Sequence, residues 1–112
     1  MDCVARALVQ FPGGAAQYTA QFGFSTAAVI LHPGAGDSTL ALVAPIDRAE
    51  AVVTVRPFGV VLGGSDGASY GVATPTDTTI QVTSVQEQAA GAASIPVDLD
   101  YVITVEIPRT NT

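Results

Sequence analysis

The chain has 112 residues, a length typical of one domain; 48% of the residues are hydrophobic and 12% are charged. This composition argues against a disordered chain, since a domain of this size buries about two-thirds of its unfolded surface. Ten acidic residues face four arginines and no lysine, giving a net charge of −6, which argues against partners such as nucleic acid or anionic membrane surfaces.

The first predicted strand covers residues 4–11, within the N-terminal sequence MDCVARALVQF. This sequence begins with an acid and has no basic region before its apolar residues, so we expect no signal peptide. No apolar run reaches the roughly 20 residues that span a bilayer, and we expect no membrane insertion. Cys3 is the single cysteine, which excludes an internal disulfide and favours a small apolar strand residue over a reactive thiol.

Short extended runs rich in Val, Ile, Thr, Tyr and Phe follow along the chain, cut by Gly, Pro and Asp. The one helix-friendly window, residues 84–93, is interrupted by Gly91. The pattern predicts an all-β fold: a single antiparallel β-sandwich over residues 1–112, of jelly-roll or immunoglobulin-like size, with about eight or nine short strands. The predicted strands cover residues 4–11, 18–25, 27–32, 38–44, 50–57, 59–62, 69–74, 78–85 and 98–107.

The last run, VDLDYVITVEIPR at residues 97–109, alternates between apolar and polar side chains. Successive side chains of a strand point to opposite faces, so the run has one dry and one wet face and reads as a structural strand that closes a sheet. Asp98 and Asp100 fall on the wet face, where we expect them to protect an edge from wrong pairing rather than to bind calcium. The dry face carries Val97, Leu99, Tyr101, Ile103, Val105 and Ile107.

Read in order, several segments resemble a small β domain of tailed-bacteriophage virion proteins, often found at the ends of tail fibres. They are ARALVQFPG at residues 5–13, FGFSTAAVILHPGAGDSTLAL at residues 22–42, the segment Thr79–Val82, and the closing strand with Arg109. In the second segment the family's small polar pair, Gly-x-Gly-Asp turn and Thr-containing strand correspond to Ser25, Thr26, Gly34, Gly36, Asp37, Thr39, Leu40 and Leu42.

The resemblance implies a non-enzymatic structural protein of the virion, assembled in the host cytoplasm. Because the chain is short and corresponds to the module by itself, we expect a capsid decoration or cement protein. Its partners would be the major capsid protein or other virion proteins. We also expect it to form a homo-oligomer, a trimer. The alternative is a tail-fibre or spike tip that binds host-surface glycan; a bacterial sugar-binding sandwich unrelated to phage is a third reading.

The sequence offers weak signals for catalysis. GASYG at residues 67–71 fits the Gly-x-Ser-x-Gly pattern around Ser69, but no helix is predicted after it and the single histidine, His32, lies upstream. His32 has no second His and no partnering Cys for a metal site, and we expect a strand-end residue near solvent. We therefore predict no enzyme, no catalytic residues, no cofactor and no metal.

Six residues are candidate interface or ligand contacts. Tyrosines that flank loops offer a ring to sugars, and a loop carboxylate can join them. Arginine suits ion pairs across interfaces. By contrast, Phe22 and Phe24 share one face of a predicted strand and are expected to pack in the core. The candidate contacts are Tyr18, Asp66, Tyr70, Arg48, Arg56 and Arg109.

Overall fold

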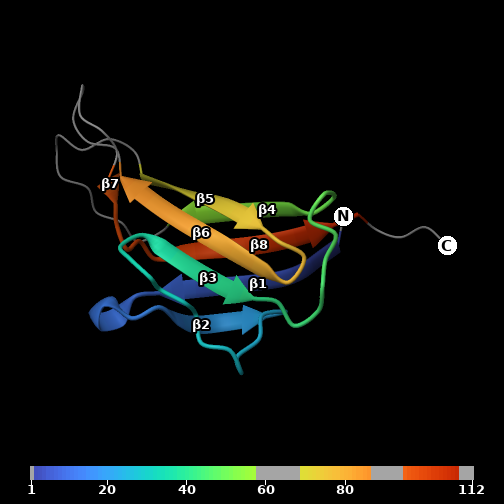
Figure 1. The fold of residues 1–112 in the computed structure, drawn as a ribbon, viewed down its shortest axis with the longest axis horizontal. Helices are drawn as coiled ribbons and strands as arrows, with labels where there is room; N and C mark the ends of the chain where they lie inside the picture. Colours follow the sequence, from blue (N-terminus) through green and yellow to red (C-terminus); the bar gives the residue numbers. More distant parts are fainter. Residues whose placement is uncertain (1, 58–68, 87–94, 109–112) are drawn as a thin grey trace.

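A computed structural model shows the chain as two antiparallel β-sheets packed face to face, and describes residues 2–57, 69–86 and 95–108 (Figure 1). One sheet has the strand order β2-β1-β8-β4; the other has the order β3-β6-β5, with β7 pairing with β6. A 3-10 turn, η1 (Pro12–Gly14), follows the first strand. The strands are β1 (Asp2–Gln10), β2 (Gln17–Phe22), β3 (Asp37–Ala41), β4 (Val52–Pro57), β5 (Ser69–Pro75), β6 (Thr79–Gln86), β7 (Ile95–Pro96) and β8 (Tyr101–Ile107).

The predicted all-β sandwich is confirmed, with fewer full strands than expected. In the described part of the chain, seven strands have five or more residues and β7 has two. The strand expected at residues 27–32 does not form, and the one expected at 59–62 lies outside the described residues. The weak helical window at 84–93 begins inside β6, and its residues 87–94 lie outside the described residues.

The segment between β2 and β3 crosses from one sheet to the other and covers an edge of β3. Leu31 and Thr39 exchange both backbone hydrogen bonds, at 3.1 and 2.8 Å, as an isolated bridge. Within the run 27–32, Ile30 reaches the core while Leu31 is exposed. Because the backbone pairing of the run is confined to this one bridge, no strand is formed there.

The core lies between the sheets and is built from alternate residues of the facing strands. Inward side chains of β1 and β8 meet those of β3 and β6, and aromatic and aliphatic residues of the β2–β3 connection complete the cluster. Alternation of this kind is what a sheet with one buried face requires. The buried cluster is Ala5, Ala7, Val9, Phe24, Ile30, Leu40, Ile80, Val82, Tyr101, Ile103 and Val105.

One buried hydrogen bond joins the two sheets across this core. Oγ of Ser38 on β3 and the hydroxyl oxygen of Tyr101 on β8 are 2.6 Å apart, and both side chains are buried. A tyrosine hydroxyl needs a partner when it leaves water, and Ser38 supplies it. Burial raises the pKa of Tyr101 well above its usual value, against a smaller lowering by the Ser38 hydrogen bond, so the phenol stays protonated.

The C-terminal strand lies inside its sheet rather than at an edge. β8 pairs with β1 on one side and with β4 on the other. Tyr101, Ile103 and Val105 are fully buried, as the alternation predicts. The expectation that Asp98 and Asp100 protect a sheet edge is therefore wrong: both precede β8, and their carboxylates accept hydrogen bonds from elsewhere in the fold.

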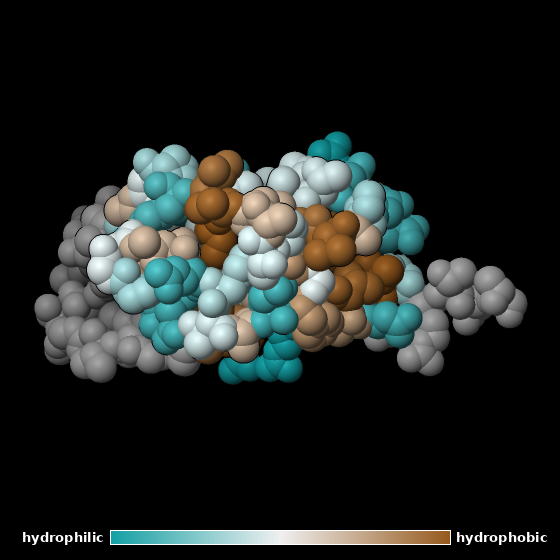
Figure 2. Space-filling model, turned by 90° about the horizontal axis from the view of Figure 1, so that it is seen from below, coloured by the Kyte–Doolittle hydropathy of each residue, from teal (hydrophilic) through white to brown (hydrophobic). Residues whose placement is uncertain are grey.

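Large apolar side chains also remain on the surface. Figure 2 shows brown apolar surface interrupting the teal polar surface on the side of the molecule that lies below β2 in Figure 1. Apolar surface that is exposed in a folded domain is informative when it is contiguous, since it then marks an interaction site. In the described part of the chain, the exposed large apolar residues are Phe22, Val29, Leu31, Val43, Val52 and Val72.

Candidate interaction surface

The outer face of the first sheet carries rows of side chains that cross all four strands. In one row, Leu8 pairs with Ala20 on β2 and with Val102 on β8, and Val102 pairs with Arg56 on β4. Side chains that are directly opposite on one face of an antiparallel sheet have Cβ atoms about 4.5–5.5 Å apart. The four side chains therefore form one continuous strip.

A second row runs beside the first, two residues further along the strands. Arg6 pairs with Phe22 on β2 and with Thr104 on β8, and Thr104 pairs with Thr54 on β4. The row thus places Arg6 between Phe22 and two threonines. Together the two rows are called the outer face below.

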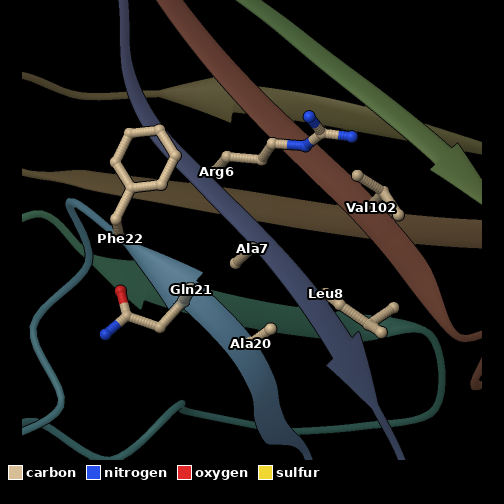
Figure 3. A pocket seen from close by; sticks show the side chains of 7 residues that line it. All are labelled: Arg6, Ala7, Leu8, Ala20, Gln21, Phe22 and Val102. Atoms are coloured by element: carbon tan, nitrogen blue, oxygen red, sulfur yellow. The ribbon is translucent and has the colours of Figure 1, made fainter.

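An open groove of about 460 Å³ lies on this face. Figure 3 shows the ring of Phe22 at one side and the side chain of Arg6 extending from β1 across β8, with Leu8 and Val102 below it. Apart from Arg6 and Gln21, the lining is apolar. The lining residues are Arg6, Ala7, Leu8, Ala20, Gln21, Phe22 and Val102.

Phe22 lies on the outer face because the chain turns immediately after it. Phe22 is 51% exposed, whereas Phe24 is 2% exposed, so the prediction that both rings pack in the core is wrong for Phe22. Gly23 has a φ of +82°, a conformation that glycine adopts readily, and it ends β2. The backbone also passes so close to β1 that a Cβ at Gly23 would lie 2.7 Å from the Cα of Ala5.

A bulge in β2 decides which way Tyr18 points. Thr19 is the extra residue between the β1-paired positions Tyr18 and Ala20, so the two paired side chains point to opposite faces of the sheet. The Tyr18 ring stacks on Phe24 at a centroid distance of 5.9 Å, and burial raises the pKa of Tyr18 to about 12. The hydroxyl of Tyr18 is buried without a hydrogen-bond partner in the described residues, which does not favour the expected ligand contact.

Two arginines lie on the outer face. Arg6 and Arg56 are exposed, and neither forms an ion pair with any described residue. Arg48, a candidate from the sequence, is also exposed but lies in the segment before β4. Its backbone N–H donates a hydrogen bond to Asp77, between β5 and β6 of the other sheet, so it is off this face. Arg6 was not among the candidates, although the alternation of β1 between Ala5 and Ala7 places it outward. Glu106 lies further along the same face of β8, paired with Cys3 and Val52.

The other sequence candidates are only partly placed. Asp66 and Arg109 lie outside the described residues, and Tyr70 enters the described part through its backbone, which pairs with Val85 in the β5–β6 ladder. Cys3 lies in β1, as expected of a residue of the first strand, and it is exposed. Among the described candidate residues, the structure places Arg56 on the outer face, together with the unexpected Arg6.

The single histidine joins the turn before β3 to the segment before β8. Nδ1 of His32 lies 2.5 Å from the carbonyl oxygen of Asp37, and Nε2 lies 3.2 Å from Oδ2 of Asp98. The other carboxylate oxygen of Asp98 accepts a hydrogen bond from the backbone N–H of Gly36 at 2.8 Å. The centroid of the Phe11 ring lies 5.1 Å from the centroid of the His32 ring. Because both ring nitrogens face acceptors, the geometry suits the doubly protonated imidazolium.

Asp100 makes the corresponding link to the end of β1. Its Oδ1 accepts a hydrogen bond from the backbone N–H of Phe11 at 3.2 Å, and its Oδ2 accepts one from Nε2 of Gln10 at 3.5 Å. Both aspartates thus hold backbone segments around the entry to β8. In the parts of the chain that the structure describes, no three His, Cys, Asp or Glu side chains are grouped closely enough to hold a metal ion.

We predict that this histidine makes the fold more stable in mild acid. The hydrogen bond to the Asp37 carbonyl raises the pKa of His32; partial burial lowers it, and the hydrogen bond and charge of Asp98 and the charge of Asp37 raise it further. Because the pKa of His32 is higher in the folded state, the stabilisation is fully present below the ordinary histidine pKa of about 6.5. It is lost as the pH rises through the pKa of the folded state.

The measurement is the free energy of unfolding by urea at about pH 6 and about pH 8, between which carboxylates stay ionised. The wild type should be less stable at the higher pH, and His32→Gln should remove most of this difference. An unchanged difference in the variant would show that His32 is not its source.

Of the GASYG motif, Gly67 and Ala68 lie outside the described residues. Ser69 begins β5 as a strand residue, paired through its backbone with Gln86, where the motif requires a strand-turn-helix corner. Both nitrogens of His32 are engaged by Asp37 and Asp98.

Comparison with protein-family models, with curated proteins and with solved structures finds no match to this chain. Among the described residues, no helix is long and apolar enough to cross a membrane.

Proposed function

We propose that this protein is a non-enzymatic structural protein of a tailed-bacteriophage particle that decorates and cements the capsid shell. The observation that carries the proposal is the open, mostly apolar groove of the outer face beside two exposed arginines. Exposed apolar surface of this kind is typical of protein interaction sites. The resemblance of residues 5–13, 22–42 and 79–82 to a β domain of phage virion proteins supports the choice of particle.

The proposed mechanism is clamping. Each copy places its outer face on a neighbouring virion protein, the major capsid protein in the first instance, and buries apolar side chains against it. A stable interface buries about 1,200–2,000 Å² in total, more than a single groove offers, so contacts to several shell subunits and a homo-oligomer, expected to be a trimer, belong to the proposal. The central position of β8 suits this role because a strand paired on both sides holds the face rigid.

The test is the copy number of this chain in purified particles, measured by quantitative mass spectrometry. Decoration predicts an abundance comparable to that of the major shell protein. It also predicts that adding the purified chain to particles stripped of it raises the temperature at which the shell opens.

A handful of copies per particle would place the chain in the tail and make the glycan-binding fibre tip the leading function. Absence from particles, or no effect of the added chain on the shell's thermal stability, would overturn the decoration proposal.

A further inference from the structure

We propose that the groove of the outer face binds an acidic, apolar segment of a partner protein, with an apolar side chain against Phe22 and Leu8 and carboxylates on Arg6 and Arg56. This inference deepens the proposed function and rests on it, because it states the chemistry that a neighbouring virion protein would present. It concerns one surface and one class of partner, a protein segment of negative charge.

The apolar part of the argument comes from the groove lining. Phe22 is half exposed at one side of the groove, with Leu8, Ala20 and Val102 beside it (Figure 3). A partner side chain of leucine or phenylalanine size that is buried there removes apolar area from water on both molecules, at about 25 cal/mol per Å². A polar or glycine-rich segment gains nothing comparable at this face.

The charge of the partner follows from the arginines. The chain has ten acids and four arginines, yet two of the four arginines lie on this one face, exposed and without an ion-pair partner in the described residues. Guanidinium groups bind carboxylates bidentately and lose little water on doing so. Because Glu106 is the acid on the same face of β8, it disfavours a second acid at that end and directs a carboxylate towards Arg6 and Arg56.

The register sets the spacing that the partner needs. Arg6 on β1 and Arg56 on β4 are separated by β8 and offset by two residues, since Arg6 pairs with Thr104 and Arg56 with Val102. From strand spacing and rise per residue, their Cα atoms lie about 12 Å apart. An extended segment covers this span with two acids about four residues apart. An apolar residue about two positions beyond the acid at Arg6 lies over Phe22, which pairs with Arg6 from β2, and all three side chains are on one face.

The probe is a synthetic peptide of about ten residues with two glutamates about four residues apart and a leucine about two positions outside one of them. Its binding to the full chain is followed by backbone amide shifts in NMR. We expect shifts at the outer face, and weaker binding at high salt because the contact is partly ionic. A peptide with lysines in place of the glutamates should bind at least roughly tenfold more weakly.

The chain offers matched control variants. Arg56→Glu should weaken peptide binding roughly tenfold, whereas Arg48→Glu, an exposed arginine off the face, makes the same change in net charge and should leave binding unchanged. Phe22→Ser should weaken binding, whereas Val72→Ser on the outside of the other sheet, at a similar exposure of 52%, should not. Equal effects in either pair, or equal binding of the lysine peptide, would overturn the inference.

A second copy of the chain is the competing occupant. A wild-type dimer in sedimentation that becomes a monomer in Phe22→Ser would show that the face is covered by the protein itself and would overturn the acidic-partner inference.

Particle binding separates this inference from the proposed function. If Arg6→Glu with Arg56→Glu still loads onto particles as the wild type does, the inference fails while decoration stands. If the wild type binds the peptide but is absent from particles, decoration fails while the chemistry of the face stands.

Discussion

Replacing Gly23 by alanine should destabilise the fold by roughly 2–5 kcal/mol, a large share of the 5–15 kcal/mol of a typical domain. A φ of +82° costs an alanine about 1–2 kcal/mol by itself. The added Cβ would also meet the backbone of β1, at the carbonyl oxygen of Val4 and 2.7 Å from the Cα of Ala5. Backbone inside a sheet cannot move aside cheaply, so the two costs add.

Gly13 provides the matched control for this substitution. Its φ is +64°, also left-handed, but a Cβ there would have nothing within 4 Å. Gly13→Ala should therefore cost about 1–2 kcal/mol, the conformational part of the effect. The comparison uses the free energy of unfolding from urea titration of both variants. Equal losses at the two positions would contradict the close approach of the β2 end to β1.

Truncating Leu40 to alanine should cost about 2–5 kcal/mol through the lost burial and the cavity that remains. Leu40 lies in β3, has no exposed surface, and packs between the sheets with the inward residues of β6 and β8. Packing at crystal-like density leaves few neighbours able to fill the gap. The same free energy of unfolding measures the effect, with the urea dependence unchanged if the variant keeps its fold.

Leu31→Ala is the matched control for Leu40→Ala, because it makes the same chemical change at an exposed position. Leu31 lies on the segment paired to β3 but is 63% exposed. Leu31→Ala should change the free energy of unfolding by less than about 0.5 kcal/mol. A large loss at Leu31, or a small one at Leu40, would mean that β3 faces the other way.

Alternation of apolar and polar residues was enough to predict the final strand and its inward face. The run from Tyr101 to Ile107 forms β8, with Tyr101, Ile103 and Val105 buried as the pattern indicates. The pattern succeeds because a strand with one face on the core and the other in water must alternate apolar and polar side chains. The same rule applied to β1 would have placed Arg6 outward.

The position of a strand within its sheet could not be predicted in the same way. The pattern of β8 fits an edge strand and a central strand equally, and pairing with both β1 and β4 depends on residues far away in the chain. For the same reason the sequence did not show that Asp98 would accept hydrogen bonds from Gly36 and His32. Such contacts join residues more than sixty positions apart.

By itself, the sequence determined an all-β sandwich without lysine or disulfide, acidic overall, with most strands near their observed places. The tertiary structure decided which side chains face outward. The extra residue Thr19 turns Tyr18 inward, and the left-handed Gly23 leaves Phe22 outside beside Arg6. The physical reason is that a bulge or a turn shifts the two-residue alternation of side chains by one position. Packing against another strand decides where that bulge or turn occurs.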